Sequence, residues 1–410
     1  MIGTTAILFL ILSIYIFFYK PWKILYVLFG SYIMTLLMQW YSLDFKISIW
    51  GFALYPVDIL SILMTIKLFV NFIKNPHIKK HLGVIYLLFF IILVSALRGI
   101  TIFGINSYFM GDFRKFYSFI ISIIYFKKYP IDFSNTKNVR FVDKAAIFML
   151  LYCYLYWFIF CLTGYSFNSV ENSMRLMHSD AAVILCLYTI YKVKEDLFDS
   201  SKKYLSFLTI MFILAIILLQ HNSVYMTFAS GCLIVLFGYK NLFKGISKKL
   251  LLQIICIALI LVITINLLGQ TEIIKTIVQT FDKFSQAKEH IGTIGTRYDI
   301  WTLNLATLNG VTEWLFGKPM GNGYGVSYLG TTWSASVHSM YVEFIMRVGV
   351  LGLILMMSSM LYLIVQGIKE HKLLITAFSV GLMFYWYPYS ITLEAGVVIG
   401  NMLYHINNKE

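Results

Sequence analysis

Long apolar runs without a charged residue recur along the chain, separated by short polar connections. Residues 145–170, 250–271 and 348–368 are clear examples. A helix needs about 20 mostly apolar residues to cross a hydrocarbon core about 30 Å thick, so each run is long enough for one crossing. The run at 204–239 is too long for one helix, and we divide it at residues 220–223, where the polar sequence Gln-His-Asn-Ser interrupts it. The pattern predicts a bundle of membrane helices.

The same rule applied to residues 1–410 predicts one all-α, polytopic membrane domain of about 12–14 spans. The predicted spans cover residues 2–19, 23–40, 52–70, 82–98, 112–126, 145–163, 179–192, 204–220, 222–239, 250–268, 338–366, 372–388 and 390–405. The first span has no small-residue cleavage site and leads through Lys20 and Lys23 into the next, so we interpret it as an anchor rather than a cleaved signal peptide.

The composition supports a membrane protein. Hydrophobic residues make up 59% of the chain, charged residues only 13%, and the mean hydropathy is +0.77. A soluble domain has about 25% charged residues, so this composition excludes an ordinary soluble enzyme. The five cysteines are Cys153, Cys161, Cys186, Cys232 and Cys256. All fall within predicted spans without a metal-ligand spacing, and we expect them to be small packing residues.

Lysine and arginine residues concentrate in alternate connections between the predicted spans. These basic connections contain Lys20 and Lys23; Lys74, Lys79 and Lys80; Lys127, Lys128, Lys137, Arg140 and Lys144; Lys192, Lys194, Lys202 and Lys203; Lys240, Lys244, Lys248 and Lys249; and Lys369 and Lys372. The positive-inside rule predicts that they are cytoplasmic, with the N-terminus outside and the C-terminus inside. The net charge of +14 is then a topology signal and an attraction to membrane lipids, and it argues against nucleic acid as a partner.

One outward connection, residues 269–337, is far longer than the others, and loops of this length are usually functional. In residues 272–284 apolar side chains share one helical face, which predicts a helix that either lies on the outer leaflet or caps the bundle. Residues 315–325 are too rich in glycine for a helix, and we expect them to form turns over an outward cavity. His338 follows this loop at the start of a membrane helix.

Short motifs follow one another in and after this loop. They are Arg-x-x-Ile-Trp (Arg297, Ile300, Trp301), Leu-Phe-Gly at 315–317, Gly-x-Gly-x-Gly at 321–325, His338, and Gly-Val-Leu-Gly at 349–352. Their order resembles the bacterial O-antigen and capsular-polysaccharide polymerases, which are related to the O-antigen ligases. Asp-Phe-Arg at 112–114, Arg175 and Gln-His-Asn-Ser-Val-Tyr at 220–225 fit the same family. Relatives commonly carry arginine at the position of Asn222, and His221 or Arg175 are our candidates for its role.

The resemblance implies a fold similar to the C-superfamily membrane glycosyltransferases and a site on the outer face of the cytoplasmic (inner) membrane. The donor would be an oligosaccharide on undecaprenyl diphosphate, and the acceptor a sugar hydroxyl of another lipid-linked repeat unit. The resemblance implies no cofactor. It leaves open whether a polysaccharide chain-length regulator is a partner. Two alternatives remain: a ligase that transfers glycan to the lipid A core, and a non-enzymatic transporter or flippase of lipid-linked sugars. A transporter should carry polar residues through the depth of several spans, whereas here they concentrate near the outer ends.

Arginine residues are the candidates for holding the diphosphate. That leaving group gains negative charge in the transition state, and the planar fork of arginine grips phosphate oxygens. The outward candidates are Arg297, Arg175, Arg114 and Arg347, and Tyr298 beside Arg297 is a further candidate. Arg114 and Arg175 have an alternative interpretation, in which their side chains reach toward lipid head groups.

Two intramembrane charges leave alternatives open. Arg347 lies within a predicted span, where a cation is costly without a partner or a water-filled cavity, so it is a site candidate. An ion pair with Glu343, one helical turn earlier, would explain it equally well. Asp58 either pairs with an arginine across the bundle or lines the cavity.

His338 is the candidate general base. The acceptor hydroxyl loses a proton as it attacks, and a positioned neutral histidine can accept that proton. The amides at a helix N-terminus disfavour imidazolium, which keeps such a ring neutral. The alternative is a histidine that caps the helix or lies in the interfacial belt. The outward carboxylates are scattered without an Asp-x-Asp pair, so we predict a metal-independent enzyme with no metal site.

Overall fold

The computed structural model of the chain describes most residues from 47 onward. The described ranges are 47–49, 52–74, 83–133, 135–163, 169–170, 173–174, 177, 179–199, 204–219, 221–238, 292–324, 326–328, 331–333 and 337–407, with isolated positions 11, 14, 15, 26, 29 and 30. The spans predicted at 2–19, 23–40 and 250–268 and the amphipathic stretch at 272–284 lie outside these residues, apart from the isolated positions.

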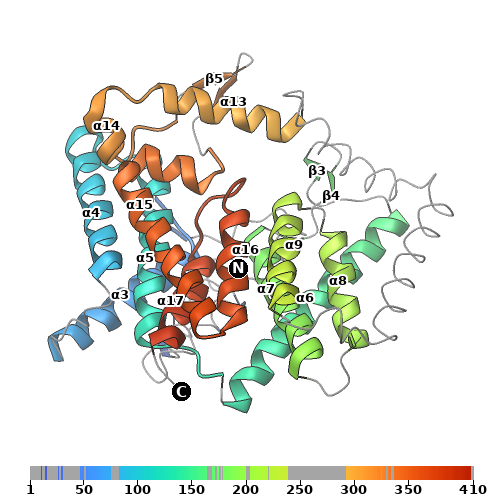
Figure 1. Cartoon of the computed structure of the whole chain (residues 1–410). Helices are drawn as coiled ribbons and strands as arrows, with labels where there is room; N and C mark the ends of the chain where they lie inside the picture. Colours follow the sequence, from blue (N-terminus) through green and yellow to red (C-terminus); the bar gives the residue numbers. More distant parts are fainter. Residues whose placement is uncertain are drawn as a thin grey trace. The chain divides into compact units, whose positions relative to one another are not determined.

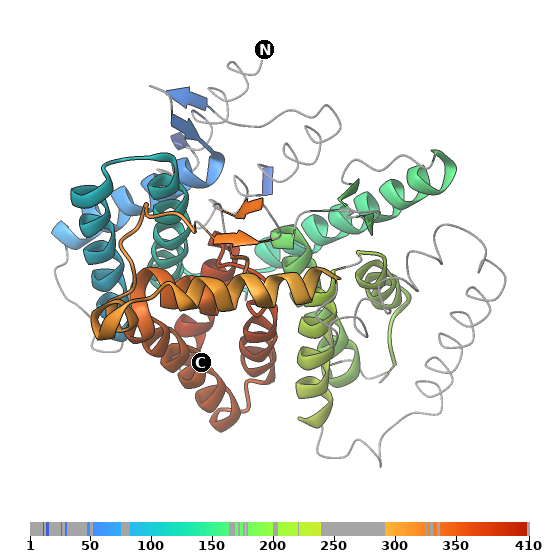
Figure 2. The same cartoon turned by 90° about the horizontal axis from the view of Figure 1, so that it is seen from above.

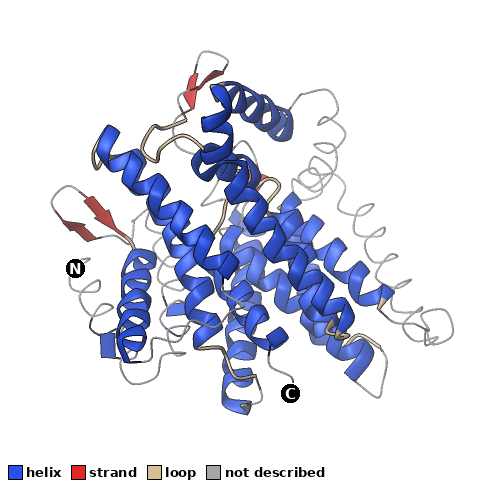
Figure 3. Ribbon diagram, turned by 60° about the vertical axis from the view of Figure 1, so that its left-hand side comes forward, coloured by secondary structure: helices blue, strands red, loops and turns tan. Residues whose placement is uncertain are grey.

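Helix dominates the described part of the chain (Figure 3). The helices are α3 (Pro56–Lys74), α4 (Gly83–Phe103), α5 (Ser107–Lys128), α6 (Thr136–Thr163), α7 (Ser179–Lys194) with the π-helical turn η3 (Glu195–Asp199), α8 (Phe207–Leu218), α9 (Asn222–Phe237), α13 (Gly292–Ala306), α14 (Gly310–Phe316), α15 (Met340–Lys369), α16 (Leu373–Tyr385) and α17 (Leu393–Asn407). The predicted helical bundle is confirmed at this level.

Short antiparallel hairpins occupy three of the described connections. They pair β1 (Ile47–Ile49) with β2 (Phe52–Leu54), β3 (Ser169–Val170) with β4 (Ser173–Met174), and β5 (Val326–Tyr328) with β6 (Thr331–Trp333). The sequence pattern did not predict them, because pairs of two or three residues carry little periodicity.

Four of the described helical segments are long and apolar enough to cross a membrane. These are Pro56–Lys74, Gly83–Phe103, Thr136–Ile159 and Met340–Lys369, and the apolar helices α8, α9 and α16 are shorter. The protein is therefore a helical membrane protein.

The chain divides into two compact units (Figure 1). The first unit comprises residues 1–138, 297–363 and 386–410, and the second comprises residues 139–296 and 364–385. In the first unit, α17 packs closely on α5, since Gly396 and Gly400 lie one turn apart on the contact face. A Cβ on Gly396 would lie 2.5 Å from the carbonyl oxygen of Phe119, so this approach of the two backbones requires glycine at that position.

The second unit packs α7, α9 and α16 together. The Thr227 hydroxyl on α9 donates to the carbonyl of Gly381 on α16 at 3.2 Å. Cys153 and Cys186 are buried and Cys232 is partly buried, and all three are free thiols, as expected of packing residues. The side chains of Cys161 and Cys256 lie outside the described residues.

α15 contains a sharp break at Gly349, which has φ 73° and ψ −179°. A continuous helix of its 30 residues would measure about 45 Å, well beyond a hydrocarbon core of about 30 Å. The part after Gly349 alone has about the length of one crossing. The span predicted at 338–366 is therefore two helical segments, and Glu343 and Arg347 lie on the first, short one.

The described part of the long loop contains α13, α14, the hairpin β5–β6 and a glycine-rich turn, residues 317–324. Figures 1 and 2 show α13 crossing above the first segment of α15. Gly317, Gly321 and Gly323 have φ of 72°, 90° and 68°, which side chains with a Cβ rarely adopt. The prediction that residues 315–325 form turns rather than a helix is confirmed for residues 317–324, whereas Leu315 and Phe316 are the last residues of α14 and Gly325 lies outside the described residues.

Candidate functional site

His338 lies in the tight turn that leads into α15. The carbonyl of Val337 before it accepts a hydrogen bond from the Trp301 indole at 2.6 Å. After it, the amide of Met340 donates to the carbonyls of Trp386 and Tyr389, at 3.1 and 2.8 Å. His338 is exposed and has φ 50°, a left-handed conformation that costs a non-glycine residue about 1–3 kcal/mol. Hydrogen bonds on both sides therefore hold an exposed histidine in a strained turn.

Arg297 attaches to the connection between α16 and α17, residues 386–392. Its Nη1 donates to the carbonyl of Pro388 at 2.9 Å, and its Cζ lies 5.6 Å from the centre of the Tyr389 ring. The same connection accepts the Met340 amide, so Arg297 and the His338 turn are both anchored to it. Tyr298, the neighbouring candidate, is 51% exposed on α13.

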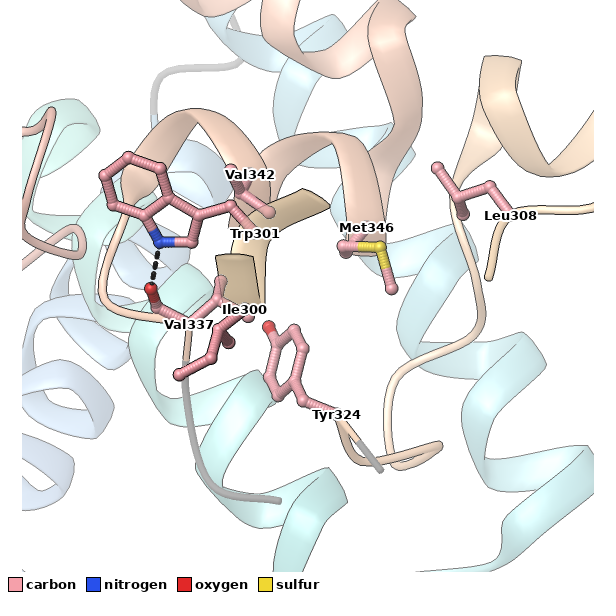
Figure 4. Close-up of a cluster of buried hydrophobic side chains, with 7 residues drawn as sticks. All are labelled: Ile300, Trp301, Leu308, Tyr324, Val337, Val342 and Met346. Carbon is pink, nitrogen blue, oxygen red and sulfur yellow. Dashed lines mark hydrogen bonds between the residues drawn. The ribbon is translucent and has the colours of Figure 1, made fainter. Parts of the chain in front are cut away.

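A buried apolar cluster supports this junction (Figure 4). It contains Ile300, Trp301, Leu308, Tyr324, Val337, Val342 and Met346. The cluster joins α13, the glycine-rich turn and the first segment of α15, and the Trp301 ring packs edge-on against Tyr387 at 5.2 Å. Burial raises the pKa of the Tyr324 hydroxyl well above its usual range, so this side chain is neutral.

Two ion pairs join α5 to the first segment of α15. Lys115 Nζ lies 3.1 Å from Oε1 of Glu343, and the Ser390 hydroxyl donates to the other oxygen of this fully buried carboxylate. Arg347 Nε lies 2.8 Å from Oδ2 of Asp112. The alternative pairing of Arg347 with Glu343 is therefore not the one that forms, because each residue pairs with α5 instead.

Arg114 and Asp58 form a third ion pair in the first unit. Arg114 Nε lies 2.7 Å from Oδ1 and 2.9 Å from Oδ2 of Asp58, and its Cζ lies 4.6 Å from the centre of the Tyr55 ring. Asp58 also accepts the backbone amide of Tyr55 at the start of α3. Asp58 was expected either to pair with an arginine or to line the cavity, and in the structure it forms the ion pair. The Arg114 side chain is 24% exposed and points to this partner.

His221 is a buried residue of the second unit, at the N-terminal cap of α9. Its Nε2 lies 3.1 Å from the carbonyl oxygen of Met177. Asn222 begins α9, and its Oδ1 is buried with no hydrogen-bond partner among the described residues. Arg175, the other candidate for the missing arginine, lies outside the described residues.

The structure adds Lys115, Tyr324 and Ser390 to the residues that the sequence suggested. One signal could have found the α5 residues: Asp112 and Lys115 are three apart on one helix, and Glu343 and Arg347 four apart on another, which places complementary charges on two facing stripes. Ser390 and Tyr324 lie in irregular segments, where no periodicity indicates a partner.

Among the described residues, no three histidine, cysteine, aspartate or glutamate side chains are grouped to hold a metal ion. Metal independence stays a prediction. Comparison of the chain with protein-family models and with curated proteins found no match.

Proposed function

We propose that this protein is a membrane glycosyltransferase that polymerises oligosaccharide repeat units carried on undecaprenyl diphosphate, as O-antigen and capsular-polysaccharide polymerases do. The observation that carries the proposal is the junction at the start of α15. There Arg297 and Trp301, far from His338 in sequence, are bonded to the segments that hold the histidine turn. These are the motif residues on which the family resemblance rests.

The proposed reaction uses His338 as general base. The acceptor hydroxyl gives its proton to the ring nitrogen as its oxygen attacks the anomeric carbon of the donor sugar. The bond from that carbon to the diphosphate oxygen breaks, and the lipid diphosphate leaves with the electron pair. Exposure of His338 and its strained conformation support this role, because strained residues concentrate at functional sites.

Arginines hold the leaving diphosphate in this proposal. Arg297 is the principal one, since the contacts with Pro388 and Tyr389 fix its guanidinium beside the histidine turn. Arg114 and Arg175 are secondary candidates. Arg114 is already paired with Asp58, so a diphosphate would have to share this guanidinium with the carboxylate.

The wider setting follows the family resemblance. We propose a multi-pass protein of the cytoplasmic (inner) membrane with about 12–14 spans and a fold of the C-superfamily type. The basic connections face the cytoplasm, and α13, α14 and the glycine-rich turn face outward. In this arrangement the site meets lipid-linked sugars after they have crossed the membrane, and a chain-length regulator would act beside it.

The test is reconstitution of the purified full-length chain in liposomes with one synthetic lipid-linked repeat unit. A ladder of products that differ by one repeat supports the polymerase. A single transfer that occurs only when lipid A core is added identifies a ligase. Movement of the lipid-linked sugar across the bilayer without a new glycosidic bond identifies a flippase and refutes the enzyme. The His338→Ala variant is the control for background transfer.

A further inference from the structure

We propose that Arg347 and Asp112 form an internal latch that holds the glycine-rich turn, residues 317–324, against α5 and α15 and so positions the His338 turn. Arg347 is then a positioning residue and does not bind the diphosphate. The catalytic consequence rests on the proposed function, whereas the latch itself does not.

Arg347 is occupied on several sides by protein atoms. Its side chain is fully buried, and Nη2 donates to the carbonyl of Gly323 at 2.9 Å. Its Cζ lies 4.0 Å from the centre of the Tyr324 ring. The Nε–H does not point along the 2.8 Å contact with Asp112, so this pair is held mainly by charge. A buried cation of this kind is kept in place because separation from its carboxylate is very costly.

Asp112 adds a second contact to the same turn. Its Oδ2 accepts the backbone amide of Gly321 at 3.2 Å, in addition to its contact with Arg347. Asn106, which caps α5, donates to the carbonyl of Gly321 at 3.2 Å. One carboxylate oxygen thus contacts both the turn and the guanidinium that grips the next part of the turn.

The backbone of the turn lies directly against α4 and α15. The amide of Lys318 donates to the carbonyl of Met346 at 2.7 Å, and a Cβ on Gly317 would lie 2.6 Å from the carbonyl carbon of Arg347. A Cβ on Gly99 of α4 would lie 2.2 Å from the carbonyl oxygen of Met320. The latch therefore closes a tightly packed interface and not a loose loop.

Tyr324 connects the latch to the candidate base. One face of its ring contacts Arg347, and the ring belongs to the buried cluster that contains Val337, the residue before His338 (Figure 4). If the turn leaves α5, Tyr324 leaves this cluster. The turn that holds His338 then loses part of its support although no residue of that turn has changed.

The Nη1 atom of Arg347 makes it necessary to test whether this residue binds the diphosphate or only positions the turn. It is buried and has no hydrogen-bond partner among the described residues. A diphosphate ligand would bind through such a nitrogen, and loss of that contact would raise KM. A positioning residue acts through the turn, and its loss would lower kcat with little change in KM.

The first experiment measures the turn without any need for activity. Met320, which is fully buried, is replaced by cysteine in a background in which the native cysteines are alanine, and labelling by a membrane-impermeant thiol reagent is followed. Asn322→Cys, at an exposed position of the same turn, normalises reagent access. We expect Arg347→Gln and Asp112→Asn to raise the rate of Met320→Cys labelling at least about tenfold, because labelling follows the population of the open turn.

The matched control is Lys372→Gln, which removes a partly exposed ion pair with Glu370 in the second unit. It should leave the rate of Met320→Cys labelling unchanged. Equal labelling rates in Arg347→Gln and the parent, both recovered as monodisperse protein, would refute the latch. Arg347→Lys keeps the charge but cannot pair with Asp112 and reach Gly323 together, so we expect a rate between those of the parent and Arg347→Gln.

The second experiment measures transfer kinetics in the reconstituted system with the synthetic lipid-linked repeat unit. Arg347→Lys should lower kcat at least about tenfold and change KM less than about twofold. A large rise in KM at unchanged kcat would refute the positioning role and make Arg347 a substrate ligand. If the unmodified protein makes no ladder while the labelling result holds, the proposed function fails and the latch stands.

Discussion

Gly349→Ala tests the break in α15, which separates the segment with Glu343 and Arg347 from the following segment, which is long enough for one membrane crossing. Gly349 has φ 73° and ψ −179°, a region that essentially only glycine occupies. A Cβ there would lie 2.0 Å from the carbonyl oxygen of Leu315 and 2.5 Å from the amide nitrogen of Phe316. Both are backbone atoms, so no change of rotamer can relieve the overlap.

The structure gives the size of the expected loss. Placing alanine in this backbone conformation costs about 1–3 kcal/mol. The added carbon in a packed site costs about 1–3 kcal/mol more, because α14 or the kink must shift. The sum, about 2–6 kcal/mol, is a large fraction of the 5–15 kcal/mol that typically stabilises a folded protein. We therefore expect Gly349→Ala to unfold at a clearly lower temperature or to fail to accumulate in the membrane.

The matched control is Gly111→Ala. Gly111 lies within α5, and a Cβ there meets no atom within 4 Å. Alanine should be neutral or stabilise the helix by up to about 1 kcal/mol. Thermal unfolding of both variants in the same detergent, read from the loss of the monodisperse peak, makes the comparison. If Gly349→Ala has the same unfolding midpoint and yield as the parent, the helix break at Gly349 and its close contact with α14 are refuted.

Further outcomes concern the proposed chemistry and topology. His338→Gln should fail to make a ladder while remaining folded and able to bind lipid-linked substrate, since an amide cannot accept the proton. The expected loss of transfer rate is about 10²- to 10⁴-fold, and a normal ladder would exclude His338 as the general base. Arg297→Lys should be nearly as inactive as Arg297→Ala. Full activity in the lysine variant would mean that Arg297 contributes only its positive charge and not a bidentate contact with the diphosphate. Activity should survive EDTA, and loss that magnesium or manganese restores would contradict metal independence. Single cysteines at Lys128 and Glu313 should label from the cytoplasmic and outer sides respectively, and a cytoplasmic Glu313 would overturn the outward site.

Local patterns explain why the elements were predictable. An apolar run of about 20 residues specifies a membrane helix wherever it lies, because the bilayer leaves the backbone few other ways to satisfy its hydrogen bonds. The spans predicted near α4, α5, α6 and α9 therefore agree with the helices within a few residues to about ten. Glycine at 317, 321 and 323 likewise specified turns through its own backbone freedom.

The partners of the charged residues could not be predicted from local patterns in the sequence. From its sequence neighbours, Arg347 had Glu343 as the obvious partner, one turn away, yet it pairs with Asp112 on another helix. Arg297 binds a carbonyl of Pro388, which no motif identifies because any residue supplies the same carbonyl. The break at Gly349 could not be predicted for a similar reason, since a straight helix and a kinked helix have the same run of apolar residues.

The sequence by itself determined that this chain forms membrane helices, where its glycine turns lie and that His338 stands at the entry to α15, because each of these depends on residues within one or two turns of one another. Only the tertiary structure decided that Arg297 and the His338 turn share an anchor and that Arg347 faces inward. Such pairings depend on which helices pack together and in what register, and packing is a property of the whole unit that many distant residues set together.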